Sequence, residues 1–360
     1  MESDEKMDTL TVVIRADADE FSPEEDASLR LAGKILQDGG LVAFPTETVY
    51  GLGGDALNKD SSRKIYAAKG RPSDNPLIVH ICRLEDLYEV AGEVTPEALK
   101  VANAFWPGPL TMIFPKADCV PKETTGGLDT VAVRFPSHPV AQKLIEYGGG
   151  FVAAPSANIS GRPSPTVAKY VSEDMNGRIE MVIDGGEVGI GLESTIIDMT
   201  VTPPQILRPG YVTKQMLEEV LGCVDTDVTI LRNDSGQAPK APGMKYRHYA
   251  PKGDLTIIEG APDAVVAYIN LQTAAAKADN LRSGVICTEE TKSLYRADIV
   301  KCIGSRADEA SIAHNLFTAL REFDDDKVDI IYSESFAGDG LGQAIMNRLL
   351  KAAGHKVIKL

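Results

Sequence analysis

The residues best suited to chemistry in this sequence are cations and hydroxyls held in loops rich in proline and glycine. The stretch AAKGRPSDNPLIVHI, residues 67–81, places Lys69 and Arg71 two positions apart, ahead of an apolar strand at Leu77–Ile81. Proline keeps the residue before it extended, so Lys69, Arg71 and Ser73 can present several donors to one anion. A solvated surface loop explains the same composition equally well.

Further loops place similar polar groups beside apolar strands. They carry Thr46 in PTET, Thr130 and Arg134 around VAVRFP, Ser156, Asn158 and Ser164 around APSAN, Ser194 in LEST, and Arg208 in LRPG. An arginine that alternates with valines is costly inside a protein unless it reaches solvent or meets an anion. Each loop taken alone is better explained as surface turn chemistry. Taken together, their cations fit a site for a phosphorylated or carboxylated ligand.

Composition and missing motifs narrow the class of protein. The chain is 43% hydrophobic and 25% charged, as in ordinary globular proteins. Its net charge of −15 disfavours wholesale binding to nucleic acid or anionic membrane but allows a local basic groove. It contains no P-loop, HExxH or GxSxG motif, and its five cysteines form no CxxC pair. The N-terminus lacks the apolar core of a signal peptide, and no run is long enough to span a bilayer, so we expect a cytoplasmic protein.

The elements that must position these loops follow from capping signals and apolar runs. Ser22-Pro23-Glu24-Glu25 is a capping box that predicts a helix ending at Gly39-Gly40, and Thr95-Pro96 predicts another to Phe105. Asp60-Ser61-Ser62 predicts a helix leading to Lys69. Because strands outnumber long helices and their connections vary, a mixed sheet is favoured. Strands are predicted at Thr11–Ile14, Leu41–Phe44, Leu77–Ile81, Leu110–Phe114, Val131–Phe135, Phe151–Ala154, Met181–Ile183, Ser194–Met199 and Gln205–Leu207.

The chain changes character after residue 212. The polar stretch Arg232–Lys240 is typical of an interdomain linker, but the following APGMKYRHYAP has two tyrosines, a histidine and two cations, which suggests that it docks on something. The remainder alternates strands and helices, which predicts a small parallel α/β domain without a dinucleotide-binding GxGxxG. We therefore expect domains at 20–212 and 253–360, with a linker at 213–252. The strands are predicted at Leu255–Ile258, Gly284–Cys287, Ile299–Ile303 and Val328–Tyr332, and the helices at Asp263–Ala276, Ala307–Glu322 and Gly342–Ala353.

The order of motifs resembles one known family. The stretches FPTETVYGLG, KGRPSDNPLIVH, WPGPLT, TVAVRFP, APSAN, SPT, ESTIID and LRPG look like those of the threonylcarbamoyl-AMP synthase family, and they cover roughly residues 21–211. The downstream APGMKYRHYAP and the α/β tail resemble the long, two-domain form of that family. Each motif alone is modest, but eight in order make a chance match very improbable. The resemblance implies a twisted mixed-sheet α/β catalytic domain of the YrdC type, followed by a Rossmann-like α/β domain.

The resemblance also implies a reaction and its partners. L-threonine, bicarbonate and ATP would give L-threonylcarbamoyl-AMP and pyrophosphate, with Mg²⁺ expected beside ATP. A separate transferase system would then move the threonylcarbamoyl group to the adenosine next to the anticodon of tRNA. This chemistry asks the protein to position two anionic reactants and to neutralise growing charge, and no residue is an obvious general base.

Site residues are carried over position by position. The threonine site would comprise Thr46, His80, Arg134, Ser194 and, through its backbone, Ala154, with Arg134 as the partner of the threonine carboxylate. Tyr246 would fold over the nucleotide, and the catalytic charges would be Lys69, Arg71 and Arg208. The positions around ATP and its phosphates are Lys69, Arg71, Asn75, Thr130, Ser156, Asn158, Ser164 and Arg208.

Alternatives remain at this level. His80 could orient threonine or be an ordinary core histidine. An RNA-binding module would use the same cationic concavity, although the net charge and the lack of interleaved aromatic and basic residues oppose it. A carbamoyl-adenylating relative would usually carry cysteine-rich and acylphosphatase-like segments, which this chain lacks.

Overall fold

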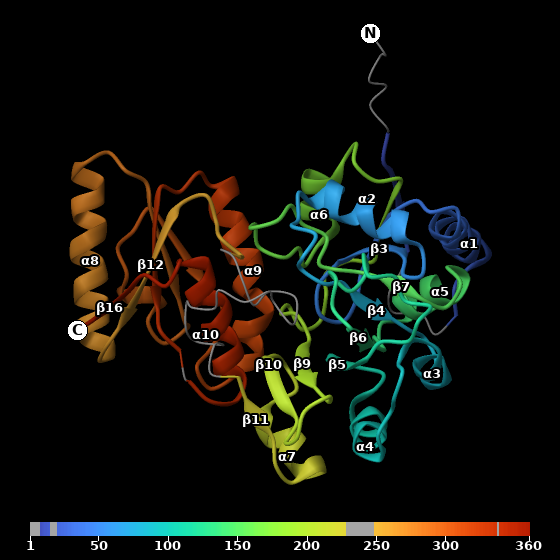
Figure 1. The fold of residues 1–360 in the computed structure, drawn as a ribbon. Helices are drawn as coiled ribbons and strands as arrows, with labels where there is room; N and C mark the ends of the chain where they lie inside the picture. The colour runs from blue at the N-terminus through green and yellow to red at the C-terminus, as the bar shows by residue number, and fades with distance from the viewer. Residues whose placement is uncertain (1–7, 15–19, 228–247, 337) are drawn as a thin grey trace.

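Two α/β units lie side by side in the computed structural model, which describes residues 8–14, 20–227, 248–336 and 338–360 (Figure 1). We call them the large-sheet domain, built on strands β1–β11, and the small-sheet domain, built on β12–β16. Across the described residues, no helix combines the length and the apolar character that a membrane span requires. Tyr246 and the predicted linker stretch Arg232–Lys240 lie outside the described residues.

The large sheet contains parallel and antiparallel neighbours, so the mixed sheet predicted from the sequence is confirmed. Its strand order is β1-β8-β2-β3-β7-β4-β6-β5-β9-β10-β11. The strands are β1 Leu10–Val13, β2 Val42–Phe44, β3 Gly51–Asp55, β4 Ile78–His80, β5 Leu110–Pro115, β6 Thr130–Arg134, β7 Val152–Ala153, β8 Met181–Asp184, β9 Thr195–Asp198, β10 Gln205–Arg208 and β11 Asp225–Thr226.

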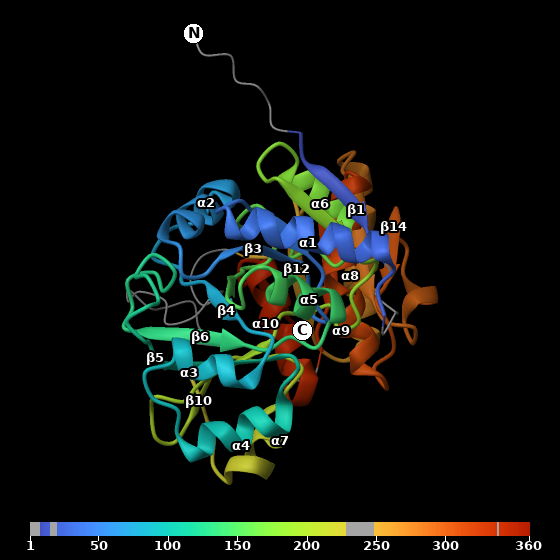
Figure 2. The ribbon, with the colours of Figure 1, turned by 90° about the vertical axis from the view of Figure 1, so that its right-hand side faces the viewer.

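Helices cover this sheet, and the caps predicted at Ser22 and Thr95 are confirmed. Helix α2 begins slightly earlier than predicted, at Lys59, because Asn58 and not Asp60 is its cap. Ser22 and Glu25 form the reciprocal capping box of α1, and the Thr95 hydroxyl accepts a hydrogen bond from the Ala98 N–H at the start of α4. Figure 2 shows α1 beside α5 and α4 beside α7. The helices are α1 Pro23–Gln37, α2 Lys59–Lys69, α3 Leu87–Val90 (after a 3₁₀ turn at Leu84–Asp86), α4 Pro96–Phe105, α5 Pro139–Tyr147, α6 Ala168–Met175 and α7 Lys214–Leu221.

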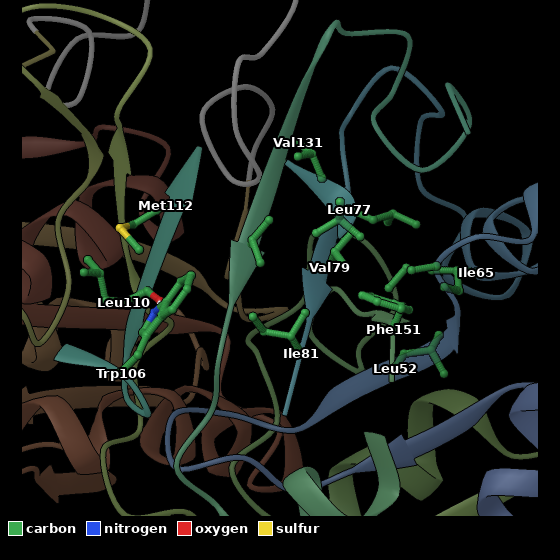
Figure 3. Packing of buried hydrophobic residues seen from close by; sticks show 14 of the residues in the cluster. Leu52, Ile65, Leu77, Val79, Ile81, Trp106, Leu110, Met112, Val131 and Phe151 are labelled. Atoms are coloured by element: carbon green, nitrogen blue, oxygen red, sulfur yellow. The ribbon is translucent and has the colours of Figure 1, made fainter. Parts of the chain in front are cut away.

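The core beneath the central strands explains which side chains remain for a site. Leu77, Val79 and Ile81 point into one apolar cluster (Figure 3). Successive side chains of a strand face opposite sides, so Ile78 and His80 must face the other side of the sheet. The same alternation on β6 buries Val131 and Val133 in the cluster and turns Arg134 away from it.

Several elements differ from the sequence prediction. Lys69 is the last residue of α2 rather than part of the loop, and Gly70 ends the helix in the left-handed conformation. Strand β3 was missed because its GLGGD sequence has little strand propensity. The structure selects glycine there because a Cβ on Gly53 would lie 2.9 Å from atoms of both Phe44 and Val152. Helix α6, strand β11 and the strand at Val357–Lys359 were also missed.

The small sheet is entirely parallel, in the order β14-β13-β15-β12-β16, which confirms the predicted Rossmann-like unit. Helices α9 and α10 lie between this sheet and the large-sheet domain, and α8 lies on the opposite face (Figure 1). The elements are β12 Asp254–Glu259, α8 Pro262–Ala278, β13 Ser283–Cys287, β14 Ile299–Cys302, α9 Glu309–Asp325, β15 Ile330–Glu334, α10 Gly340–Ala352 and β16 Val357–Lys359.

The two domains share a buried contact. Val49 and Leu192 of the large-sheet domain and Tyr249 belong to the same apolar cluster as the inner faces of α9 and α10. The Tyr249 ring lies 5.0 Å from that of Phe317 on α9, and the Thr166 hydroxyl bonds that of Thr318 at 2.7 Å. The domains are therefore packed together through both apolar and polar side chains.

Candidate functional site

One cavity gathers most of the polar groups that the sequence singled out. It holds about 660 Å³ of empty space, part of which is open to solvent. It is lined by Thr46, Val49, Tyr50, Gly51, Lys69, Arg71, Ile78, His80, Arg134, Ala154, Pro155, Ser156, Asn158, Ser160, Glu193, Ser194, Arg208, His248 and Tyr249. The loops around β3, β4, β6, β7, β9 and β10, far apart in sequence, thus converge on one cationic cavity.

Strands β4 and β6 place a histidine beside an arginine. They pair in parallel with His80 opposite Arg134, so both side chains leave the sheet on the same face. Burial, reinforced by the charge of Arg134, lowers the pKa of the His80 imidazole to about 3. The ring is therefore neutral at physiological pH, with Nδ1 3.0 Å from the Ile78 carbonyl oxygen.

Arg134 is paired but retains donor capacity. Its Nη2 donates to the Glu47 carboxylate at 2.7 Å, and both side chains are largely buried. Among the described residues, neither Arg134 Nε nor Glu47 Oε2 has a hydrogen-bond partner. A buried guanidinium with an unused donor at a cavity wall is suited to a ligand carboxylate. The sequence did not reveal that Glu47, in the PTET loop, would be its protein partner.

Lys69 is buried and holds the APSAN loop in place through hydrogen bonds. Its ammonium donates to the backbone carbonyls of Ser156 and Asn158, the latter at 2.5 Å. Burial, together with the charge of Arg71, lowers the pKa of Lys69 well below its usual value. The Ser156 hydroxyl donates to Asn158 Oδ1 at 2.6 Å, so this loop is held in one shape at the cavity wall.

Arg71 organises its own loop. Its guanidinium donates to the carbonyls of Asn75 and Pro76, at 3.2 and 3.0 Å, and burial lowers its pKa to about 10. The group therefore stays charged at neutral pH. Ser73, expected beside Lys69 and Arg71, is exposed and does not line the cavity.

Arg208 and Ser194 form a second polar wall. Arg208 donates through Nε to the Ser194 carbonyl at 3.0 Å and through Nη2 to the Ser194 hydroxyl at 3.1 Å. That hydroxyl also lies 2.8 Å from Thr111 Oγ1. Burial lowers the pKa of Arg208 to about 10, opposed by the nearby Tyr249 and Glu193. The Arg208 guanidinium is thus a fixed positive charge at the cavity wall, suited to binding an anion.

Glu193 is the carboxylate at the cavity wall, and the sequence analysis did not select it. Burial tends to raise the pKa of this carboxyl, but the charges of Arg348 and Arg208 and the Ser164 hydrogen bond outweigh burial and lower it. Ser164 donates to Glu193 Oε1 at 2.6 Å. The LEST loop thus carries a buried, ionised acid next to Ser194.

Not every predicted residue reaches the cavity. The lining includes Thr46, Ala154 and the residues described above, but not Asn75, Thr130 or Ser164. Asn75 is buried, and its Oδ1 has no hydrogen-bond partner in the described part of the chain. His248 and Tyr249 do line the cavity, so this part of the linker motif docks on the large-sheet domain, as the sequence suggested that the motif docks on something.

The described residues around the cavity form no cage of side chains for a metal ion. Within the described residues, no group of three or more His, Cys, Asp or Glu side chains is arranged to hold one. The carboxylate at its wall, Glu193, already accepts bonds from Ser164 and Arg348. Because Mg²⁺ prefers carboxylate, phosphate and water oxygens, these residues do not fit a resident Mg²⁺ site.

Comparison with known proteins decides the family. A family model described as Telomere recombination matches residues 34–210, and one described as Threonylcarbamoyl-AMP synthase, C-terminal domain, matches residues 212–354. The chain is 49% identical over 336 residues to the threonylcarbamoyl-AMP synthase of Pyrococcus abyssi, covering 93% of this chain and 97% of that protein. The chain belongs to the threonylcarbamoyl-AMP synthase family. The resemblance inferred from the motifs is thereby confirmed.

Other relatives agree over nearly the whole length. The threonylcarbamoyl-AMP synthase of Bacillus subtilis is 47% identical and covers 95% of this chain and 97% of its own. A crystal structure of P. abyssi Sua5 complexed with L-threonine matches with a TM-score of 0.91 and 46% identity, over 98% of this chain and all of that one. Both the mixed-sheet domain and the Rossmann-like domain are therefore shared with this synthase family.

Proposed function

We propose that the protein joins L-threonine, bicarbonate and ATP into L-threonylcarbamoyl-AMP, releasing pyrophosphate and water. The observation that carries this proposal is the convergence of Lys69, Arg71, Arg134 and Arg208 on one cavity, beside a neutral His80. Both the carboxylated and the phosphorylated reactant need such charges. Membership of the synthase family and the threonine-bound Pyrococcus relative support the same reaction.

Threonine would lie between the β4–β6 face and the PTET loop. The unused Nε of Arg134 would bind its carboxylate, while Thr46, His80, Ser194 and the Ala154 backbone would surround its amine and hydroxyl. A neutral imidazole can accept a hydrogen bond without repelling an ammonium group. The amine must lose a proton before its lone pair attacks the carbon of bicarbonate, with loss of water, to give a carbamate.

The nucleotide would occupy the wall formed by the end of α2 and the APSAN loop. Ser156, Asn158, Lys69 and Arg71 would fix the ATP phosphates, and Arg208 would face the α-phosphate. The carbamate oxygen would attack that phosphorus, and the bond to the β-phosphate oxygen would break to release pyrophosphate. The protein's part is to orient the reactants and balance charge, which needs no covalent intermediate with the chain.

Three of the nucleotide positions would act at a distance, because they do not line the cavity. Asn75 would shape the Arg71 loop, Ser164 would act through Glu193, and Thr130 would set the start of β6. Tyr246 would cover the nucleotide, as the family resemblance implies. Mg²⁺ would arrive with ATP, bound by phosphates and water.

The wider setting of the reaction is also a proposal. The product would be consumed by a separate transferase that modifies tRNA, and this chain would have weak or no contact with nucleic acid, given its net charge of −15. The cytoplasm is the proposed compartment, since each of the five cysteines is a free thiol, as is usual in reducing surroundings.

The direct test is release of pyrophosphate by the purified protein. Release should require ATP, threonine and bicarbonate together, and omission of any one should abolish it. Arg71→Ala should lose turnover while circular dichroism shows a folded protein, because Arg71 bonds only backbone carbonyls in the described chain and leaves no buried acid unpaired. ATP hydrolysis independent of threonine, or no turnover with all three substrates, would refute the proposal.

A further inference from the structure

Arg348, a fully buried arginine of the small-sheet domain, forms hydrogen bonds with the large-sheet domain. Arg348 on α10 has no solvent exposure. Its Nε and Nη2 donate to the side-chain Oε2 and the backbone carbonyl of Glu193, at 3.1 and 3.2 Å. Its Nη1 donates to the Pro209 carbonyl at 2.5 Å and to Asn347 Oδ1 at 3.3 Å. One guanidinium therefore bonds two separate loops of the other domain.

These two loops carry residues of the cavity wall. Glu193 directly precedes Ser194, and Pro209 directly follows Arg208. The side chain of Arg208 returns to Ser194 through the two hydrogen bonds described above. Arg348 thus closes a ring of bonds that runs through both loops from behind the cavity.

The loops also touch at their backbones, so a shift of one is felt by the other. A Cβ on Gly210 would lie 2.5 Å from the Thr195 nitrogen and 2.9 Å from the Glu193 carbonyl oxygen. No side chain larger than hydrogen fits this contact without movement. The separation of Ser194 and Arg208 is therefore restrained by this tight backbone contact and by the hydrogen bonds of Arg348.

The chemistry of Arg348 suits this task better than a general packing role. A guanidinium presents donors in a rigid fork, whereas a lysine is a single flexible charge. Glu193 is held on its other oxygen by Ser164, so its carboxylate has little freedom to turn. Buried ion pairs add little net stability, because desolvation offsets their attraction, but they can fix one geometry.

We propose that Arg348 is a positioning residue of the reaction. It touches no substrate; it holds Ser194 and Arg208 at the spacing that the carbamate and the α-phosphate require. This inference rests on the function proposed above. Displacement of a reacting group by about 1 Å can cost about 100-fold in rate, so loosening the fork should be visible in turnover.

The first test compares Arg348→Lys with Arg321→Lys. Arg321, on α9, is the matched control, because it is also buried and also bonds the other domain, at the Asp174 carboxylate and the Pro163 carbonyl. Neither of those partners lines the cavity. Arg348→Lys should lower kcat by about 10- to 100-fold with KM for ATP changed by less than about 3-fold, since Lys69, Arg71, Ser156 and Asn158 would still hold the phosphates. Arg321→Lys should lower kcat less than Arg348→Lys does, because its partners adjoin Ser164 and Ile159 and not the Ser194–Arg208 pair.

The second test separates positioning from simple stability. Arg348→Gln leaves Glu193 buried without its charge partner and could unfold the protein, so Glu193→Gln is added to remove that charge. Glu193→Gln alone keeps Arg348 and shows what the loss of the acid costs. The double variant should regain a thermal midpoint near that of wild type while its kcat stays at least about 10-fold below that of Glu193→Gln alone. A purely structural role would give the double variant the kcat of Glu193→Gln alone.

Three results would overturn the inference: wild-type kcat in Arg348→Lys, equal losses in Arg348→Lys and Arg321→Lys, or equal kcat in the double variant and in Glu193→Gln alone. Each presupposes a wild-type protein that releases pyrophosphate with threonine and bicarbonate. If wild type does not, the proposed function itself fails and this inference falls with it.

Discussion

The Arg134→Gln substitution tests the threonine site and has two separable effects. It removes the donor proposed for the threonine carboxylate, and it also removes the partner of Glu47, which lies 2.7 Å from Arg134. The first effect should appear in ligand affinity and the second in stability. Because the two groups belong to one ion pair, a single number cannot describe the outcome.

The magnitudes follow from burial. A hydrogen bond to a charged group contributes about 1.5–3 kcal/mol, so threonine affinity should fall about 10- to 150-fold. Breaking a fully buried ion pair by removing one partner costs about 3–5 kcal/mol. The side chains here are 5% and 14% exposed, so the cost should lie near the lower value, about 3 kcal/mol.

Calorimetric titration of L-threonine and thermal unfolding measure the two effects. Arg30→Gln, which removes an exposed arginine paired with Asp26, is the control for the change in net charge and should alter neither. If Arg134→Gln is too unstable to titrate, Glu47→Gln/Arg134→Gln removes the unpaired acid and should recover most of the stability without the affinity. If either Arg134→Gln or the double variant is folded and binds threonine as tightly as wild type, the proposed role of Arg134 is refuted.

Three further predictions concern stability. The pKa of an unfolded histidine is near 6.5 and that of buried His80 is about 3, so between these values the unfolded state binds a proton that the folded state does not. The free energy of unfolding should therefore keep its full His80 contribution above about pH 6.5 and fall by up to ~1.4 kcal/mol per pH unit below it. Chemical denaturation of His80→Asn should show a shallower dependence on pH; parallel plots of stability against pH for the variant and wild type would contradict the prediction. Gly53→Ala should lower the free energy of unfolding in urea by about 1–3 kcal/mol, because the new Cβ would clash with Phe44 and Val152. The control Gly189→Ala, whose Cβ would meet no atom nearer than 4.0 Å, should change it by no more than about 0.5 kcal/mol. Equal effects of the two substitutions would show that the packing around β3 is loose. Ser22→Ala should cost about 1 kcal/mol through loss of the α1 cap, and Ser28→Ala inside the same helix should not destabilise; a neutral Ser22→Ala would show that the capping box contributes nothing.

Several parts of the fold could be read from the sequence because they depend on neighbouring residues. The Thr95-Pro96 signal predicts the exact start of α4, since a capping hydroxyl and its N–H partner lie three residues apart. The alternation IVH on β4 and VAVR on β6 separates core from site, so the orientation of His80 and Arg134 follows from period two alone. Strand β3 could not be predicted in this way, because Gly53 is required by its close packing against Phe44 and Val152, which lie elsewhere in the chain.

The sequence by itself determined the family, the alternating elements and most of the polar side chains that meet in the cavity. Tertiary structure alone decided their partners: Arg134 pairs with Glu47, 87 residues away, and Glu193 with Arg348, 155 residues away in the other domain. It also decided that Lys69 braces the Ser156–Asn158 backbone from the last position of a helix. Local periodicity fixes which way a side chain faces, whereas the group that it meets depends on how distant segments pack, and no spacing in the sequence encodes that contact.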